Sequence, residues 1–192
     1  MTMQICMGLL LALGLASAAC SDPQDDDEAP EGVIYGEGVS DEAWVAIDEA
    51  PLVTDDASAP RLVRPTALPR SGPPPTFEWE AGAIARVHVP RHSHPARTRG
   101  LLAALFGVPV ARAHLPPVTG AVFRLVLNLG TGEPVRVLTK ATIWTPDATS
   151  WSRIAAAPGP IGVELVGTYL DSNRVTEGPF VSSQPASLTF EE

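Results

Sequence analysis

The histidines of this chain are its clearest candidates for metal chemistry, because all of them fall in one short stretch: His88, His92, His94 and His114. His92 and His94 occupy alternate positions, which lie on one side of an extended strand and can share a metal ion. A structural zinc site takes four protein ligands and a catalytic site three, and neither H-E-x-x-H nor C-x-x-C occurs here. The sequence therefore predicts no metal site, and a metal-binding periplasmic protein or metalloenzyme using these histidines is the alternative hypothesis.

Arginines accompany the histidines, at positions that include Arg86, Arg91, Arg97 and Arg99. Guanidinium groups bind phosphate and sulfate with paired hydrogen bonds, so a polyanion is one possible ligand of this stretch. Acidic residues earlier in the same chain compete for these charges, and we favour internal pairing in a solvated basic loop. A chain of net charge -9 is not expected to bind nucleic acid.

Trp144 and Trp151 are candidate residues for binding a glycan, provided that their rings are exposed. The more common role of such tryptophans is packing in or at the edge of a core. The sequence contains no G-x-S-x-G, no G-x-x-x-x-G-K-[ST] and no G-x-G-x-x-G that opens a helix. We therefore expect a protein that is not an enzyme and that carries no cofactor.

The beginning of the chain has the pattern of a signal peptide. No Asp, Glu, Lys or Arg occurs in residues 1–21, and an apolar run over residues 7–15 leads into small residues before Cys20. This run is shorter than the roughly 20 apolar residues of a spanning helix. We expect residues 1–19 to be removed.

Residues 17–20, Ser-Ala-Ala-Cys, resemble the lipobox of bacterial lipoproteins. The resemblance implies that Cys20 receives diacylglycerol and that the protein is held on a membrane by this N-terminal lipid. Ser21 resembles the signal for sorting to the outer membrane, on its periplasmic or cell-surface face. Cleavage after Ala18, which leaves Cys20 unmodified, would instead make the protein secreted.

Acidic residues dominate the segment that follows: residues 22–56 contain 13 acids and no bases. Such a segment repels itself and buries little apolar surface, so we expect residues 20–60 to form a disordered acidic tether. Within it, Ser40 precedes two acids and Pro51 follows an apolar pattern that includes Trp44 and Ile47. This arrangement predicts a short helix near residues 41–50, docked on its own domain.

After the tether, short runs of apolar and β-branched residues alternate with proline and glycine, which is typical of an all-β domain. We expect strands at residues 76–80, 83–89, 121–129, 135–143, 161–170 and 186–190, a hairpin through residues 128–133 and one helical turn near residues 145–151. Phe77 and Trp79 alternate with Glu78 and Glu80, which gives that strand one apolar and one wet face.

Residues 62–65 (Leu-Val-Arg-Pro) and 75–79 (Pro-Thr-Phe-Glu-Trp) resemble the entry of fibronectin type III-like and immunoglobulin-like domains of exported bacterial proteins. Residues 115–123 and 144–151 are similar to parts of such domains in bacterial lipoproteins. The resemblance covers residues 61–192 and implies an antiparallel β-sandwich, with a long, partly helical insertion at about residues 91–118. It implies no catalytic residue. We therefore expect an exported lipoprotein with a binding or structural role and a protein or glycan partner.

Overall fold

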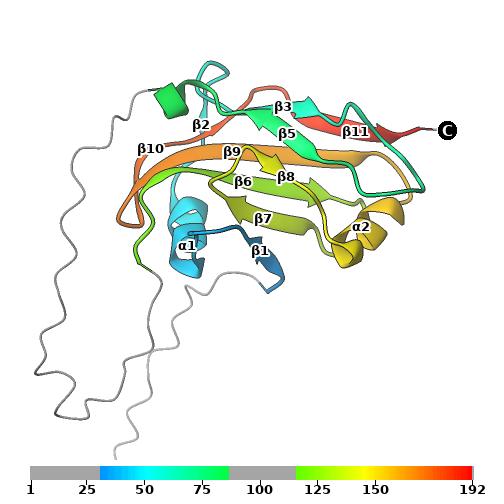
Figure 1. Cartoon of the computed structure of the whole chain (residues 1–192). Coiled ribbons are helices and arrows are strands. Elements are labelled where there is room, and N and C mark those ends of the chain that lie inside the picture. Colours follow the sequence, from blue (N-terminus) through cyan, green and yellow to red (C-terminus); the bar gives the residue numbers. More distant parts are fainter. Residues whose placement is uncertain (1–30, 87–115, 192) are drawn as a thin grey trace, which may run out of the picture.

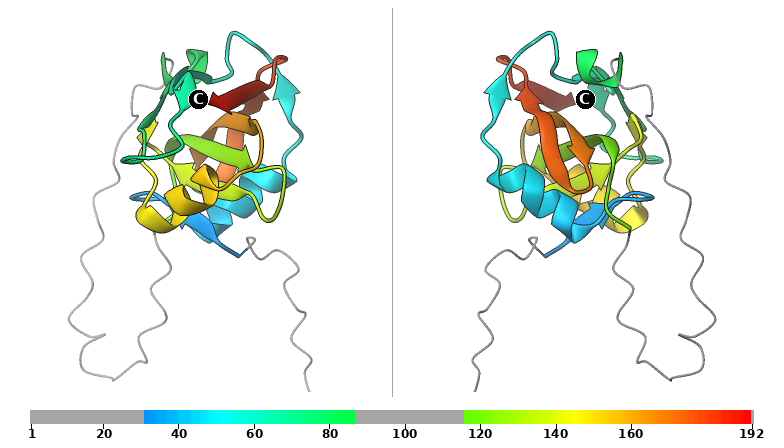
Figure 2. Two further views of the ribbon diagram at one scale, coloured as in Figure 1. Left: turned by 90° about the vertical axis from the view of Figure 1, so that its right-hand side faces the viewer. Right: turned by 90° about the vertical axis from the view of Figure 1, so that its left-hand side faces the viewer.

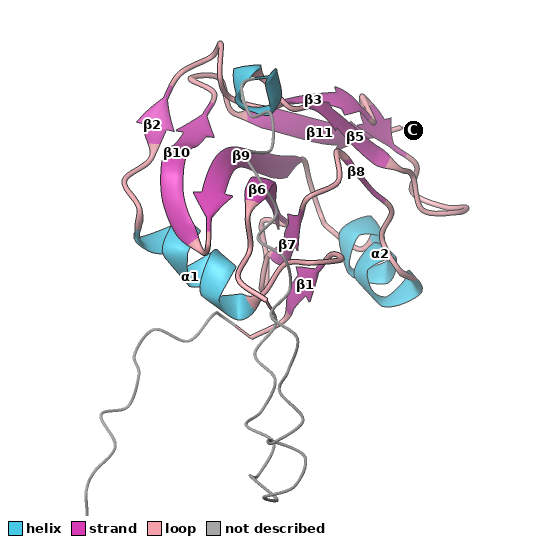
Figure 3. Ribbon diagram, turned by 60° about the vertical axis from the view of Figure 1, so that its left-hand side comes forward, coloured by secondary structure: helices cyan, strands magenta, loops and turns pink. Residues whose placement is uncertain are grey.

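The computed structural model of the chain describes residues 31–86 and 116–191, and strands dominate these ranges (Figure 3). The two α-helices of the described part are α1 (Asp41–Glu49) and α2 (Ala148–Ala155), and η1 (Ala83–Arg86) is a short 3-10 helix. The strands are β1 (Val33–Tyr35), β2 (Val53–Thr54), β3 (Arg61–Arg64), β4 (Ala67–Leu68), β5 (Phe77–Glu80), β6 (Gly120–Asn128), β7 (Val135–Thr139), β8 (Ile143–Trp144), β9 (Ile161–Asp171), β10 (Arg174–Val181) and β11 (Ala186–Phe190). None of these helices is long and apolar enough to cross a bilayer.

Two sheets form the frame of the molecule, which confirms a mainly β fold consistent with a sandwich. The larger sheet has the order β1-β7-β6-β9-β10-β2, with β11 also paired to β9 and β4 paired to β11. The smaller sheet has the order β3-β5-β8. Figures 1 and 2 show β3 and β5 on one side of β6 and β9, and α1 on the other side. The large sheet therefore has two covered faces.

The first core lies between the two sheets, and alternate residues of β5, β6, β7 and the first half of β9 contribute to it. Phe77 and Trp79 of β5 are buried while Glu78 and Glu80 are exposed, as the sequence predicts. Trp79 meets Phe123 of β6 edge to face, with 6.0 Å between ring centroids. The N-cap residue Asp147 starts α2, because its carboxylate accepts a hydrogen bond from the Ser150 amide at 2.7 Å. Helix α2 then contributes to this same core.

The second core lies on the opposite face of the large sheet, under α1. Ala43, Trp44 and Ile47 are the buried residues of this helix, and they pack with Val122 and Leu170 of the sheet. The predicted helix is thus present, at Asp41–Glu49. Two acids in its first turn favour the helix through its dipole.

The predicted tether is wrong from residue 31 onward, because β1, α1 and β2 belong to the folded domain. β1 pairs in parallel with β7, and β2 pairs in parallel with β10. The acids of this segment stand among apolar residues whose side chains enter the second core, and this burial outweighs the self-repulsion of the charges. The folded domain therefore begins well before residue 61, and residues 20–30 lie outside the described residues.

Several strand predictions also need correction. Residues 83–86 form η1 and not the start of a strand, and the run over 135–143 is divided into β7 and β8. β10 was not expected, because Gly178 and Pro179 inside it resemble turn residues; they sit at an irregular register with β9. The expected strands of β5, β6, β9 and β11 and the β6–β7 hairpin are present. Most of the predicted insertion lies outside the described residues.

Candidate functional site

The residues selected from the sequence fall into two groups. Cys20 and the four histidines lie outside the described residues. Trp144 is half-buried against Phe77, with 5.4 Å between ring centroids, and its ring is tilted by 45°. Trp151 is only 8% exposed and donates its Nε1 hydrogen to the Gly72 carbonyl at 3.3 Å. Trp151 therefore contributes to the first core and offers no open ring face.

Metal chemistry has no candidate in the part of the chain that the structure describes. Within residues 31–86 and 116–191, no group of three or more His, Cys, Asp and Glu side chains is arranged to hold an ion.

A pocket lies where the edge of β9 changes partner. Residues 161–163 of β9 pair with β11, and residues 166–171 pair with β10. Between them, Glu164 and Leu165 pair with β6 on one side and, among the described strands, with none on the other. Four residues, 182–185, connect β10 to β11 across from these two, so the connection must bulge away from the sheet.

The bulge leaves a cavity of about 340 Å³ between β9, β3 and the 182–185 connection. This volume is within the range of small-ligand sites. Its apolar lining comes from three segments of the chain: Pro60, Leu62, Val163, Leu165, Val181 and Pro185. Its polar lining consists of Arg61, Asn128, Glu164, Ser182 and Gln184. We call this cavity the β9 pocket.

Asp56 holds the rim of the β9 pocket in place. One oxygen of its carboxylate accepts hydrogen bonds from the Ser182 hydroxyl at 2.9 Å and the Ser183 amide at 2.7 Å, and the other accepts from the Ser183 hydroxyl at 2.7 Å. These bonds to Ser183 and Ser182 lower the pKa of Asp56. The 182–185 connection is thereby tied to the segment between β2 and β3.

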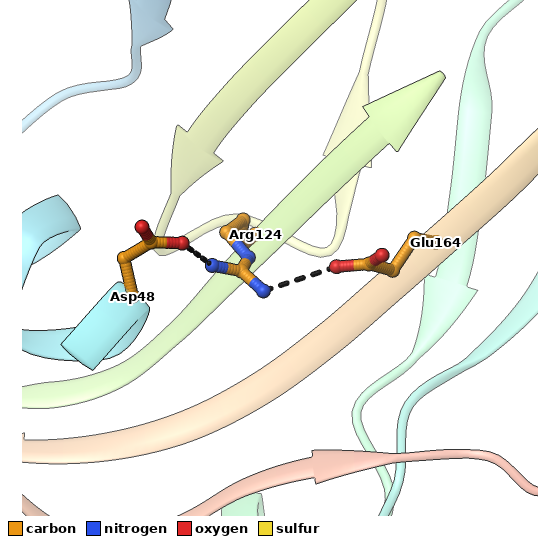
Figure 4. Close-up of polar contacts among 3 residues, drawn as sticks. All are labelled: Asp48, Arg124 and Glu164. Atoms are coloured by element: carbon orange, nitrogen blue, oxygen red, sulfur yellow. Dashed lines mark hydrogen bonds and ion pairs between the residues drawn. The ribbon is translucent and has the colours of Figure 1, made fainter. Parts of the chain in front are cut away.

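Glu164 is fixed in the pocket wall by a buried arginine (Figure 4). Arg124 of β6 donates from Nη1 to Asp48 of α1 at 2.6 Å and from Nη2 to Glu164 at 3.0 Å. The Arg124 side chain is 7% exposed, whereas the Asp48 and Glu164 side chains are 64% and 41% exposed. Since two carboxylates share one guanidinium, the group carries one net negative charge.

Glycine shapes the pocket region at two positions. Gly162 faces Asn128 across the sheet, and a β-carbon at Gly162 would make only ordinary contact, 3.6 Å from the Asn128 Cβ. At Gly167 a β-carbon would come within 3.0 Å of both Ile84 and Pro60. Gly167 therefore lets the segment before β3 lie close on β9, whereas Gly162 leaves space that a larger side chain would fill.

The β9 pocket has no local signature in the sequence. The switch of strand partner depends on a pairing between residues distant in the chain, and β10 itself was not predicted. Comparisons of the chain with protein-family models, with curated proteins and with solved structures gave no match.

Proposed function

We propose that this chain is an exported, non-catalytic binding protein that is held on a bacterial membrane by lipid at Cys20. The pattern of residues 1–19 and the lipobox-like residues 17–20 support export and lipidation. Two or more acyl chains make such anchoring stable, where one is marginal. The proposed address is the outer membrane, on its periplasmic or cell-surface face.

We further propose that the sandwich is of the fibronectin type III-like or immunoglobulin-like type. In such sandwiches the first, second and fifth strands form one sheet, and the third, sixth and seventh form the other. The order β3-β5-β8 and the run β7-β6-β9-β10 fit that arrangement, with β7 as the extra strand beside β6. The N-terminal segment, β4 and β11 are additions to it. Folds of this type serve many functions, so the fold supports a binding role without specifying one.

The β9 pocket is the observation that most directly supports a binding role. Its lining is mostly apolar, its polar groups converge from separate segments, and its one carboxylate is already paired with Arg124. This composition is typical of recognition sites. It offers neither an activated nucleophile nor a pair of free carboxylates for acid-base chemistry. A protein or glycan partner is the expected ligand class.

The anchor is tested by measuring the intact mass and detergent partitioning of the full chain expressed in a bacterium, beside its Cys20→Ala variant. We expect a mature chain that begins at Cys20, carries acyl mass and enters the detergent phase, all of which the variant loses. An unmodified chain beginning at Ala19 in the aqueous phase would make the protein secreted.

The alternative role, metal binding through the histidines of residues 88–114, is tested with the same material. We expect the purified protein to contain no stoichiometric transition metal and to gain no thermal stability from added Zn²⁺. A saturable rise in melting temperature that requires His92 and His94 would favour the metal hypothesis instead.

A further inference from the structure

The β9 pocket exposes the edge of a strand, and this limits what it can bind well. Successive residues of a strand direct their backbone groups to opposite edges. Of Glu164 and Leu165, one therefore directs both its N–H and its C=O toward the side where no described strand pairs. A backbone donor and acceptor at an open edge are best satisfied by another extended backbone.

The side chains around this edge also fit a ligand with an extended peptide backbone. Asn128 and Gln184 add amide groups that donate and accept hydrogen bonds, as peptide groups require. Leu62 and Leu165 supply an apolar surface beside them. A plain acyl chain would cover the apolar surface but would not use these amide groups, whereas an extended peptide can bond to them and to the strand edge together.

The negative charge of Glu164 in the pocket wall favours peptides that carry a positive charge. Glu164 shares Arg124 with Asp48, so its carboxylate retains capacity to accept hydrogen bonds while its position is fixed. Arg61, the cation of the pocket lining, lies 3.5 Å from Glu80 and is drawn toward that partner. A positively charged group of the ligand is therefore favoured beside Glu164.

We propose that the β9 pocket binds a short extended peptide segment of a partner protein. One apolar side chain of the peptide enters between Leu62 and Leu165, its backbone pairs with the open edge of β9, and a lysine or arginine lies beside Glu164. This assignment rests on the proposed function only in taking the sandwich to be a binding module. It deepens that function by naming the chemical class of the ligand.

The test is a selection of phage-displayed random seven-residue peptides on the purified full chain. We expect enriched peptides that combine an apolar residue with a nearby Lys or Arg. Their binding should fall at least tenfold in Gly162→Leu, which fills the pocket without backbone strain, since the new β-carbon meets only Asn128 at ordinary contact distance.

Gly159→Leu is the matched control, because a β-carbon at Gly159 meets no atom within 4 Å and the residue is outside the pocket lining. It should bind the selected peptides as the parent does. Glu164→Gln should reduce the preference for Lys or Arg while apolar contacts remain. Near-ultraviolet circular dichroism checks that each variant keeps the parent fold.

Two results would overturn the proposal: no enrichment over a bare surface, or enriched peptides whose binding Gly162→Leu leaves unchanged. Lauric acid serves as the competing probe, and its binding in place of any peptide would assign the pocket to an acyl chain. None of these outcomes depends on Cys20. A chain without lipid would refute the anchor and leave the peptide test intact, and failure of the peptide test would leave the anchor intact.

Discussion

The two faces of the large sheet are covered in different ways. The first face meets the small sheet and α2 across a core of large apolar side chains, where Trp79 Nε1 is a buried polar atom without a hydrogen-bond partner. The second face, under α1, holds such atoms on several residues: Ser40 Oγ, Trp44 Nε1, Arg124 Nε and Thr168 Oγ1. Thr168 belongs there because its cross-strand partner Val122 is in the second core.

This difference indicates that the α1 layer is the less stable of the two. A buried polar atom without a partner costs about 1–3 kcal/mol relative to a satisfied one. Such costs reduce what the burial of Trp44 and Ile47 contributes. We infer that the segment from β1 to β2 opens locally before the sandwich unfolds, as regions with fewer satisfied contacts do in other proteins.

The largest expected effect comes from removing the same side chain on each face. Leu125 and Leu170 are both fully buried, Leu125 in the first core and Leu170 in the second. Each replacement by alanine should lower the free energy of unfolding by about 2–5 kcal/mol. We expect Leu125→Ala to lie at the upper end and Leu170→Ala at the lower end, because α1 can shift to fill the space.

Urea unfolding followed by circular dichroism measures both values. Val63→Ala is the surface control, since this side chain is 37% exposed and should change stability by less than about 0.5 kcal/mol. An equal or larger loss for Leu170→Ala would show that the second face is packed as firmly as the first.

A second comparison concerns the ion pairs under α1. Asp48→Ala removes one partner of buried Arg124 and should cost about 1 kcal/mol, because Asp48 itself is largely exposed. Arg124→Met removes the buried charge together with its unpaired Nε, and well-packed apolar residues often replace buried ion pairs at little cost. We therefore expect Arg124→Met to be close to neutral.

Amide hydrogen exchange separates the local effect of these changes from the global one. Asp48→Ala should speed exchange in α1 and leave β6 and β9 unaffected. If exchange rises in all three elements together, the α1 layer does not open separately.

A smaller effect is expected from the two helix caps. Asp147→Ala removes a capping hydrogen bond from α2 and should cost about 1 kcal/mol. Ser40 at the start of α1 makes no side-chain cap bond, and its hydroxyl is buried without a partner, so Ser40→Ala should cost close to nothing. Thermal melts of the two variants provide the test, and equal destabilisation would contradict the assignment of the caps.

Sequence patterns predicted the helices and strands that are determined by residues close together in the chain. Alternation at Phe77 to Glu80 predicted β5 and its buried face, and the acids and Pro51 around Trp44 predicted α1. The β6–β7 hairpin followed from the glycines between two apolar runs. In each case residues within a few positions of one another determine the backbone.

The features that the sequence did not predict depend on contacts between distant segments. β1 and β2 are short and gain their hydrogen bonds from β7 and β10, so their own composition resembles a tether. The β9 pocket depends on three pairings of β9, none of which has a local signature. Arg124 is one charged residue in an otherwise apolar strand, and such a residue is the one local signal of the buried ion pair.

The smallest effect on stability is expected at Asp56, through which the N-terminal segment binds the 182–185 connection. Hydrogen bonds from Ser183 and Ser182 stabilise the ionised carboxylate and lower its pKa in the folded state. Because the pKa of Asp56 is lower in the folded than in the unfolded state, its hydrogen bonds stabilise the fold above the unfolded-state pKa of about 4. This stabilisation is lost as the pH falls through the lower, folded-state pKa. The connection should therefore detach only in acid, below about pH 4.

The chemical shift of the Ser183 amide, followed by nuclear magnetic resonance during a pH titration, reports this protonation directly. We expect a midpoint below about 4 in the parent and no titration of this amide in Asp56→Asn. Side-chain methyl signals of Leu127 and Val137 should stay constant over the same range, because these residues lie in the first core and it holds no titrating group among its buried residues. A midpoint at or above 4, or parallel changes in these methyl signals, would show that the rim and the first core respond to acid as one unit.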